Sequence, residues 1–387
     1  VFPTPTSYQA KEGSFVLSAN TSLKADPSFL NELDILKNEL ENHTSIKFNA
    51  SQSASNLIEL KEDKSIADEG YTLSISKNSI IISASQPRGA FYAIQSLKSI
   101  LPVDSWKSKL ATVDFPCMEV KDQPRFGYRG LHIDVARNFQ TKEQVKRVLN
   151  WMAMYKLNKL HFHFSEDDAW RVEIPALPEL TTVGVKRGHT LDSKENMPAS
   201  YGSGGDINNI QSSYYTRNDY IDILKHAKSK FIDVIPEIET PGHARAAIKA
   251  MDARYARLIK EGKPEEANQY LLSDPEDQSV YVSAQYFRDN VMCVAQPGVY
   301  NFIATTVDAF IDMHREAGMP LKTIHVGGDE VPQGVWEKSP IAQNLLKQLP
   351  KDKYRQTSDL WLYYWDKVHA ILKERNLYLS GWEEIGM

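Results

Sequence analysis

The pattern of apolar and polar residues divides the chain near residue 122. Before that point, residues 71–85 alternate between apolar and polar side chains around a Lys-Asn-Ser turn, which predicts a β-hairpin. Residues 27–43 and 87–101 carry apolar side chains at helical spacing, so each predicts an amphipathic helix. We therefore expect a small α/β domain over residues 1–122, followed by a linker over residues 115–126, a segment with two prolines.

Beyond residue 122, strand-like segments alternate with helical ones. The helix after the first strand is well marked, because Thr141 and Gln144 form a T-x-x-Q capping box just before an apolar stripe. Alternating strands and helices of this kind imply a parallel sheet, either open or closed into a barrel. The strand-like segments are residues 128–136, 159–165, 231–239, 322–328 and 377–383.

The fold class that we expect for residues 123–387 is a (β/α)8 TIM-type barrel. The length of this segment is sufficient for such a barrel. The sequence nevertheless predicts about five βα units rather than eight, since residues 184–216 and 252–299 read as insertions that take up much of the length. We expect the remaining strands to lie beyond residue 387 in a longer natural chain.

Acidic and aromatic residues gather where the predicted strands end. Asp134, the run Glu166-Asp167-Asp168, Glu239, the pair Asp329-Glu330 and the pair Trp382-Glu383 all lie at or just past a strand's carboxyl end. Barrel enzymes build their sites at this end of the sheet. Five strand ends that all carry such residues favour an enzyme over a purely structural sheet.

Composition and charge narrow the possible partners. The chain has 387 residues, of which 42% are hydrophobic and 25% charged, and its net charge is −5, which argues against nucleic acid or an anionic membrane as the main partner. No apolar run is long enough to predict a membrane span. The chain begins with Val1 rather than Met, which suggests a processed, exported protein, either periplasmic, secreted or lysosome-like. Only Cys117 and Cys293 are present, and the sequence leaves open whether they are bonded.

One alternative function is a metal-dependent barrel hydrolase. His161 and His163 have the His-x-His spacing of a metal site at a strand end, and His243 and Asp329 would complete the ligand set. Alternate residues of a strand point the same way, however, so packing or hydrogen bonding inside the barrel explains the same spacing.

Five motifs occur in order along the chain and carry a family resemblance. They are R-G-x-x-x-D-x-x-R at 129–137, H-x-H-x-x-x-D at 161–167, E-T-P-G-H at 239–243, H-V-G-G-D-E at 325–330 and G-W-E-E at 381–384. Together with the segment at 89–102 of the small domain, they make nearly the whole chain resemble the family 20 glycoside hydrolases, the β-N-acetylhexosaminidases.

The resemblance implies an exo-acting, retaining hydrolase that releases terminal β-linked N-acetylglucosamine or N-acetylgalactosamine. In this family the 2-acetamido oxygen of the substrate is the nucleophile and forms an oxazoline intermediate, an exception to the two-carboxylate rule. By similarity, Glu330 would be the general acid and then the base, and Asp329 would orient the acetamide N–H. The expected partner is an amino-sugar-terminated oligosaccharide or glycoconjugate, with no cofactor and no metal, and the oligomeric state stays open.

The resemblance also assigns supporting roles, and the sequence departs from the family pattern at two places. Arg129 would bind sugar hydroxyls, Asp167 and His243 would form a pair that supports Glu330, and Trp382 would line the acetamide pocket. The second-strand motif has Phe162 where Trp is usual, and Glu-Asp-Asp at 166–168 where Asp-Asp-Gln is usual. The family's pocket tyrosine and further tryptophans would lie past residue 387, so an inactive, truncated sugar-binding barrel is a third hypothesis.

Overall fold

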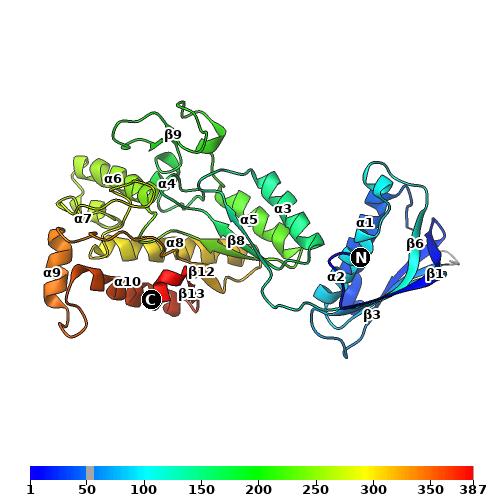
Figure 1. Cartoon of the computed structure of the whole chain (residues 1–387). Coiled ribbons are helices and arrows are strands. Elements are labelled where there is room, and N and C mark those ends of the chain that lie inside the picture. The colour runs from blue at the N-terminus through cyan, green and yellow to red at the C-terminus, as the bar shows by residue number, and fades with distance from the viewer. Residues whose placement is uncertain (49–55, 387) are drawn as a thin grey trace. The chain divides into compact units, whose positions relative to one another are not determined.

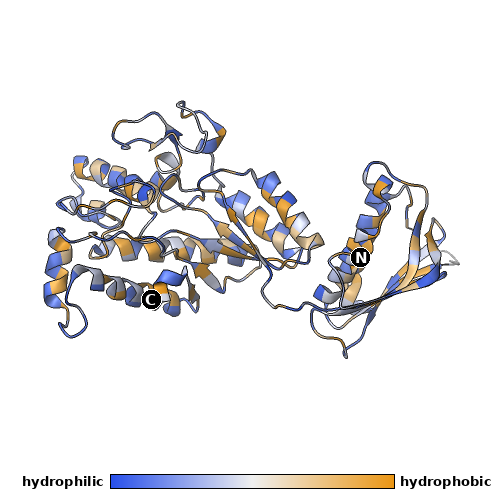
Figure 2. Ribbon diagram, viewed as in Figure 1, coloured by the Kyte–Doolittle hydropathy of each residue, from blue (hydrophilic) through white to orange (hydrophobic). Residues whose placement is uncertain are grey.

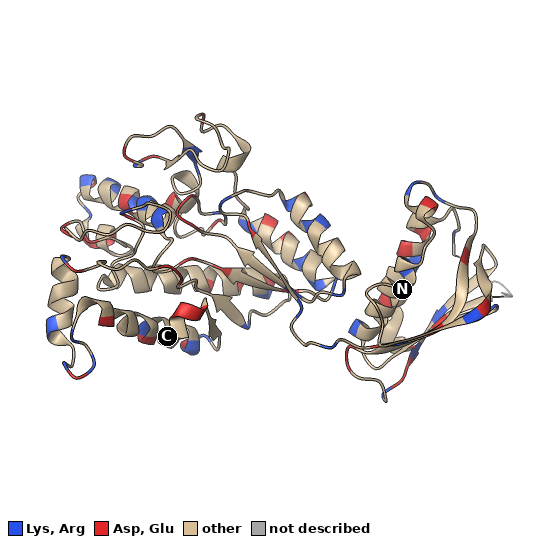
Figure 3. Cartoon of the chain, in the orientation of Figure 1, with Lys and Arg blue, Asp and Glu red and all other residues tan. Residues whose placement is uncertain are grey.

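The computed structural model describes residues 1–48 and 56–386, which fall into two compact units (Figure 1). The first unit contains Val1–Gly130 together with Val148–Asn158 and Lys230–Ile232. The second contains the rest of the chain. Basic and acidic residues are interspersed in both units (Figure 3).

The first unit pairs a mixed sheet with two helices. Among the described residues the sheet has six strands in the order β1-β6-β4-β5-β3-β2. The predicted hairpin is confirmed, since β4 and β5 pair antiparallel, and both predicted helices are present. The elements are β1 (Ser7–Leu17), β2 (Thr21–Ala25), a 3-10 turn (Pro27–Phe29), α1 (Leu30–His43), β3 (Asn56–Glu62), β4 (Tyr71–Ile75), β5 (Ser79–Ala84), α2 (Pro87–Ser99), a 3-10 turn (Val103–Trp106) and β6 (Val113–Asp122).

The segment predicted as a linker is instead mostly strand β6. Val113, Phe115 and Cys117 alternate with exposed residues, which is the pattern of a half-buried strand. Pro116 is tolerated inside the sheet because it lies opposite Ser14, next to an irregularity in the pairing of β1 with β6. A proline in a strand needs such a break in the hydrogen-bond ladder, and the sequence alone does not reveal where the partner strand provides it.

The second unit is built on a sheet of five strands within the described part of the chain. The strand order is β13-β12-β11-β8-β7, and the pairs that join β8, β11, β12 and β13 are parallel. Each of the five predicted strand segments contains one of these strands, so that prediction is confirmed. Their bounds are β7 (Gly130–Asp134), β8 (Lys159–His163), β11 (Asp233–Glu237), β12 (Thr323–His325) and β13 (Tyr378–Ser380).

Helices separate successive strands of this sheet, as a parallel arrangement requires. The capping box before α3 is confirmed, since the amide of Gln144 donates to Thr141 and the amide of Thr141 donates to Gln144. Apolar and polar residues lie on different faces of the helices (Figure 2). The helices are α3 (Lys142–Met154), α4 (Glu179–Thr182), α5 (Arg217–Lys228), α6 (Arg245–Lys260), α7 (Pro264–Asn268), α8 (Pro297–Glu316), α9 (Pro340–Gln348) and α10 (Leu360–Glu374). Short elements in the connections are β9 (Arg187–Gly188), β10 (Met197–Pro198) and 3-10 turns at Ile210–Ser212, Thr357–Asp359 and Glu383–Gly386.

Two further expectations concern cysteines and membranes. Cys117 and Cys293 are both buried and free, so the structure contains no bond between them. Within the described residues, no helix combines the length and apolar character needed to cross a bilayer.

Candidate active site

A buried glutamate joins four strands of the second unit. The sheet register places Glu237 of β11 directly between His163 of β8 and His325 of β12. Among the described residues, four imidazoles approach its carboxylate: His163 at 2.7 Å, His325 at 2.8 Å, His161 at 3.0 Å and His132 of β7 at 3.1 Å. Glu237 is fully buried, so these nitrogens take the place of water around its charge.

The charges in this histidine–glutamate cluster follow from burial and from the short contacts. Burial alone would raise the pKa of Glu237, but the four histidine contacts lower it well below its usual range. Burial likewise acts to lower the pKa of His163, yet the contacts with Glu237 and the nearby Asp134 and Glu166 raise it. Burial dominates at His161 and lowers its pKa. These pKa shifts favour an ionised Glu237 and a positive charge on His163 beside it.

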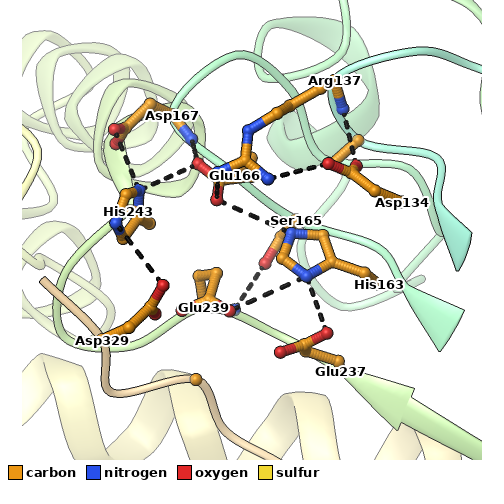
Figure 4. Close-up of polar contacts among 12 residues, drawn as sticks. Asp134, Arg137, His163, Ser165, Glu166, Asp167, Glu237, Glu239, His243 and Asp329 are labelled. Carbon is orange, nitrogen blue, oxygen red and sulfur yellow. Dashed lines mark hydrogen bonds and ion pairs between the residues drawn. The ribbon is translucent and has the colours of Figure 1, made fainter. Parts of the chain in front are cut away.

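A second histidine site lies just beyond the ends of β8 and β11 (Figure 4). The Nδ1 atom of His243 is 3.1 Å from a Glu166 oxygen and 3.5 Å from an Asp167 oxygen. Its Nε2 atom is 3.4 Å from Glu330 and 3.8 Å from Asp329. One buried imidazole thus connects the acids after β8 with the two adjacent acids after β12.

Other groups hold the two acids that face Nδ1 of His243. Asp167 accepts hydrogen bonds from the Arg245 amide at 3.1 Å and from the Asn290 side chain at 3.0 Å. Glu166 forms an ion pair with Arg137, whose guanidinium also contacts Asp134 at 2.7 Å. These contacts fix both carboxylates, so the orientation of the imidazole is fixed as well.

His243 carries a positive charge over the whole neutral range. Burial alone would lower its pKa, but the hydrogen bonds and charges of Asp167 and Glu166 raise it to about 11. Burial raises the pKa of Glu166 despite its contacts with His243 and Arg137. A fixed cation therefore faces Asp329 and Glu330, the two acids that follow β12.

The two glycines that precede these acids are required by space and by backbone conformation. Gly327 and Gly328 have φ values of +72° and +100°, which favour glycine. A Cβ atom on Gly327 would lie 1.9 Å from a Glu239 oxygen, and one on Gly328 would lie 2.3 Å from Ile385. Glu330 itself has a φ of +49°. The chain can make this turn only with glycines, and the turn presents Asp329 and Glu330 to His243.

The buried Glu239 and the partly exposed Asp329 form a pair of adjacent acids at this turn. Both Glu239 oxygens and one Asp329 oxygen lack a hydrogen-bond donor among the described residues. Burial, together with the negative charges of Asp329, Glu237 and Glu166, raises the pKa of Glu239 well above its usual range. A proton on Glu239 would pair one of its oxygens with Asp329, because a protonated carboxyl can donate a hydrogen bond to a neighbouring carboxylate.

Glu330 differs from its neighbour in exposure and in contacts. Its side chain is 47% exposed, whereas that of Asp329 is 26% exposed. Its carboxylate accepts one hydrogen bond from a side chain, the amide of Gln285, at 2.8 Å. Of the two acids, Glu330 is the more open to an incoming molecule.

The contacts of Arg129 argue against the sugar-binding role predicted for it. Arg129 precedes β7, and all five of its N–H donors are engaged inside the first unit. They reach both oxygens of Glu69, the hydroxyl of Tyr92, and the carbonyls of Phe126 and Lys156 at 2.7–3.2 Å. No donor remains for a sugar hydroxyl.

Two residues within the same motifs belong to the His243 site, although the sequence analysis assigned neither of them a role. Arg137 closes the motif that Arg129 opens, and its side chain is 28% exposed beside Asp134 and Glu166. Glu166 is closer to His243 than the predicted partner Asp167. The motif contained a signal for Arg137, because Arg137 follows the carboxyl end of β7, the end at which barrel enzymes build their sites. Arg129 instead precedes the first residue of that strand.

The predicted pocket residue Trp382 lies against the histidine–glutamate cluster. It is half-buried, and its ring centroid is 4.9 Å from His325, 5.7 Å from His161 and 5.9 Å from His132. Its amide donates to the carbonyl of Gly327 at 2.9 Å. Trp382 is therefore next to the glycine turn, and its role in a sugar pocket stays a prediction.

The structure does not combine the four ligands of the metal-hydrolase hypothesis into one site. His161 and His163 both face Glu237, whereas His243 groups with Glu166 and Asp167. In the described residues, the sets with metal-ligand spacing are His132-His163-Glu237, His161-Glu237-His325 and Glu166-Asp167-His243. The first two sets share Glu237, whose carboxylate the four histidines already contact.

Models of known families match almost the whole chain. Residues 126–387 match the catalytic domain of glycosyl hydrolase family 20, and residues 1–123 match domain 2 of the same family. The chain belongs to glycosyl hydrolase family 20. The fold of its second unit is accordingly that of the family's TIM barrel, preceded by a small α/β domain.

Named relatives and solved structures agree with the family 20 assignment. A β-hexosaminidase of Vibrio vulnificus is 35% identical over 384 residues, which cover 99% of this chain and 44% of the relative. An N,N'-diacetylchitobiase of Vibrio harveyi is 44% identical over 261 residues, 67% of this chain and 29% of that protein. The structure of an exo-β-N-acetylglucosaminidase from Vibrio harveyi in complex with N-acetylglucosamine superposes with a TM-score of 0.85 at 31% identity, covering 99% of this chain and 55% of that one. The chain thus spans about half the length of such relatives.

Removal of the charge at Glu237 is expected to destabilise the second unit of this family 20 chain. Glu237→Gln removes the buried negative charge that four imidazoles contact, which should lower the free energy of unfolding by about 3–5 kcal/mol. Urea denaturation measures the change. Glu316→Gln is the matched control, because Glu316 forms an exposed ion pair with Arg217 that is worth at most about 1 kcal/mol. Equal costs for the two variants would contradict the prediction.

The charge on His243 makes a pH-dependent contribution to stability. A histidine in an unfolded chain titrates near pH 6.5, and the folded pKa of His243 is about 11. Its stabilisation is therefore complete below about pH 6.5 and is lost as the pH rises towards 11. We expect the difference in free energy of unfolding between the parent and His243→Gln to shrink steadily from about pH 7 to 10. The exposed His369 on α10 supplies the control His369→Gln, and a parallel trend there would argue against this origin.

Proposed function

We propose that the protein containing this chain is an exo-acting β-N-acetylhexosaminidase that hydrolyses terminal β-linked N-acetylglucosamine or N-acetylgalactosamine with retention. The observation that carries the proposal is the pair Asp329 and Glu330, consecutive in sequence and both within 4 Å of one His243 nitrogen. Two-carboxylate glycosidases need acids on opposite sides of the scissile bond, at least about 5 Å apart. Neighbouring acids on one turn suit a reaction whose nucleophile is the substrate's own acetamide oxygen.

The different surroundings of the two acids support different roles. Glu330 is the more exposed, so it is the group that we assign to protonate the leaving oxygen and later to activate water. Asp329 is deeper and lies next to Glu239, whose pKa burial and the charge of Asp329 raise well above its usual range. An ionised Asp329 can accept the acetamide N–H and stabilise the positive charge that develops on the oxazoline ring.

The cations of the site complete the proposed arrangement. The protonated His243, held by Glu166 and Asp167, keeps the carboxylate of Glu330 in place. Arg137 is partly exposed and fixed by Asp134 and Glu166, so its remaining donors can bind sugar hydroxyls, the role that the sequence had assigned to Arg129. The natural glycan is an amino-sugar-terminated oligosaccharide or glycoconjugate.

Substitution of the two acids tests the proposed reaction in the protein expressed from its complete gene. Glu330→Gln should lower kcat/KM on an N-acetylglucosamine disaccharide by about two to four orders of magnitude, since the leaving sugar needs a proton. Asp329→Asn should cost about two to three orders of magnitude, because it weakens transition-state stabilisation. Steady-state kinetics of the parent and of the two variants on this disaccharide measure these effects.

Exposed acids of α8 provide matched controls, and one substrate gives a decisive contrast. Glu316→Gln and Asp312→Asn change half-exposed side chains in surface ion pairs and should leave kcat/KM within about twofold of the parent. A plain β-glucoside lacks the acetamide nucleophile and should be a very poor substrate. Efficient hydrolysis of that glucoside would overturn the proposal.

Chelator treatment separates this proposal from a metal-dependent hydrolase. The proposed reaction uses only carboxylates, His243 and the substrate's acetamide, so activity should stay within about twofold after dialysis against EDTA. A metal hydrolase would lose activity and regain it with Zn²⁺. Binding of an N-acetylglucosamine thiazoline without any hydrolysis by the parent would instead favour a sugar-binding protein.

A further inference from the structure

Gln285, in the segment between α7 and α8, makes a direct contact with the proposed general acid. Its side-chain amide donates to an oxygen of Glu330 at 2.8 Å. The other atom of the same amide, Oε1, is buried and has no hydrogen-bond partner among the described residues. We propose that Gln285 is a positioning residue that holds the carboxyl group of Glu330 in both of its protonation states, an inference that rests on the function proposed above.

A tight turn fixes the backbone on either side of Gln285. The amide of Ser283 donates to the carbonyl of Phe287 at 2.8 Å, and the amide of Tyr286 donates to the carbonyl of Ser283 at 2.9 Å. Tyr286 has a φ of +68°, so the chain reverses its direction at this point. The guanidinium of Arg245 lies 5.1 Å from the centre of the Phe287 ring, a cation–π contact that helps to hold the turn.

The segment that carries this turn is anchored on both sides of the acid. Asn290 reaches Asp167 with its side chain and accepts a hydrogen bond from the amide of Ala244 with its carbonyl. On the other side, Met292 accepts a hydrogen bond from the indole of Trp336, and Ser279 accepts one from the amide of Lys338. The support of His243 and the chain after Glu330 are thus tied to the same segment, so Gln285 has a fixed position relative to both.

An amide suits a carboxyl group that changes its protonation state within one reaction. Glu330 begins as an acid, becomes a carboxylate when the leaving oxygen takes its proton, and recovers a proton from water in the second step. The NH2 group of Gln285 donates to the carboxylate, and the unpaired Oε1 can accept from the protonated form after rotation of the amide. Among the described residues, the other group from a distant segment that contacts the Glu330 side chain is His243, which is protonated and can donate but not accept.

The role of Glu330 as an acid is sensitive to the leaving group, and this gives a specific test. Gln285→Met keeps the length of the side chain but removes both polar atoms, and Gln285→Glu keeps the shape but removes the donor. On a disaccharide, whose leaving sugar needs a proton, both variants should lower kcat/KM about ten- to a hundredfold. On an aryl N-acetylglucosaminide with a strongly acidic phenol, the loss in kcat/KM should stay below about threefold, because kcat/KM reports the departure of the leaving group and a phenolate needs little help.

The matched control is Gln296→Met, which removes an amide from the same segment. Gln296 donates to the carbonyl of Ser273 and does not contact Glu330. It should behave like the parent on both substrates, and a change there equal to that of Gln285→Met would assign the effect to the segment as a whole and overturn the proposal. Equal losses on the disaccharide and the aryl substrate, or no loss on either, would also overturn it. If the parent hydrolyses neither substrate, it is the proposed function that fails.

Discussion

The contact of Glu237 with four histidines is the interaction on which the carboxyl end of the sheet depends. Glu237 lies on β11, and its buried carboxylate contacts imidazoles from β7, β8 and β12. This one side chain therefore joins four strands of the sheet. Removing Glu237 leaves four buried or partly buried imidazoles without the carboxylate that they share. The positions of the acids that follow these strands, such as Glu166 and Asp329, depend on how these contacts hold the strands together.

Acids outnumber cations just beyond the carboxyl ends of these strands, and three features reduce the repulsion between the acids. Arg137 and the protonated His243 neutralise Glu166 and Asp167. Burial next to other carboxylates raises the pKa of Glu239 well above its usual range and so disfavours its ionisation. Glu330 is turned towards solvent. Neighbouring acids thereby acquire different environments, as the division of roles proposed for Glu330 and Asp329 requires.

The two glycines and the segment after α7 explain why this geometry is possible. Gly327 leaves the space that Glu239 occupies, and the left-handed backbone at Gly327, Gly328 and Glu330 turns the chain so that consecutive acids face one histidine. The segment that holds Gln285 and Asn290 then contacts both ends of the acid network. Side chains on a rigid sheet and side chains on an anchored loop meet at Glu330.

The sequence by itself determined the five strands, the small α/β domain and the positions of most acids, because period and motif spacing are local properties of the chain. It identified Asp329, Glu330 and His243, which the structure brings together. Only the tertiary structure showed that Arg129 is engaged inside the first unit whereas Arg137 contacts Glu166, and that Glu166 is closer than Asp167 to His243, since each result depends on which partners lie within reach. Gln285 and Glu237 carried no motif signal. Their importance arises from contacts between segments far apart in the chain, which only packing can create.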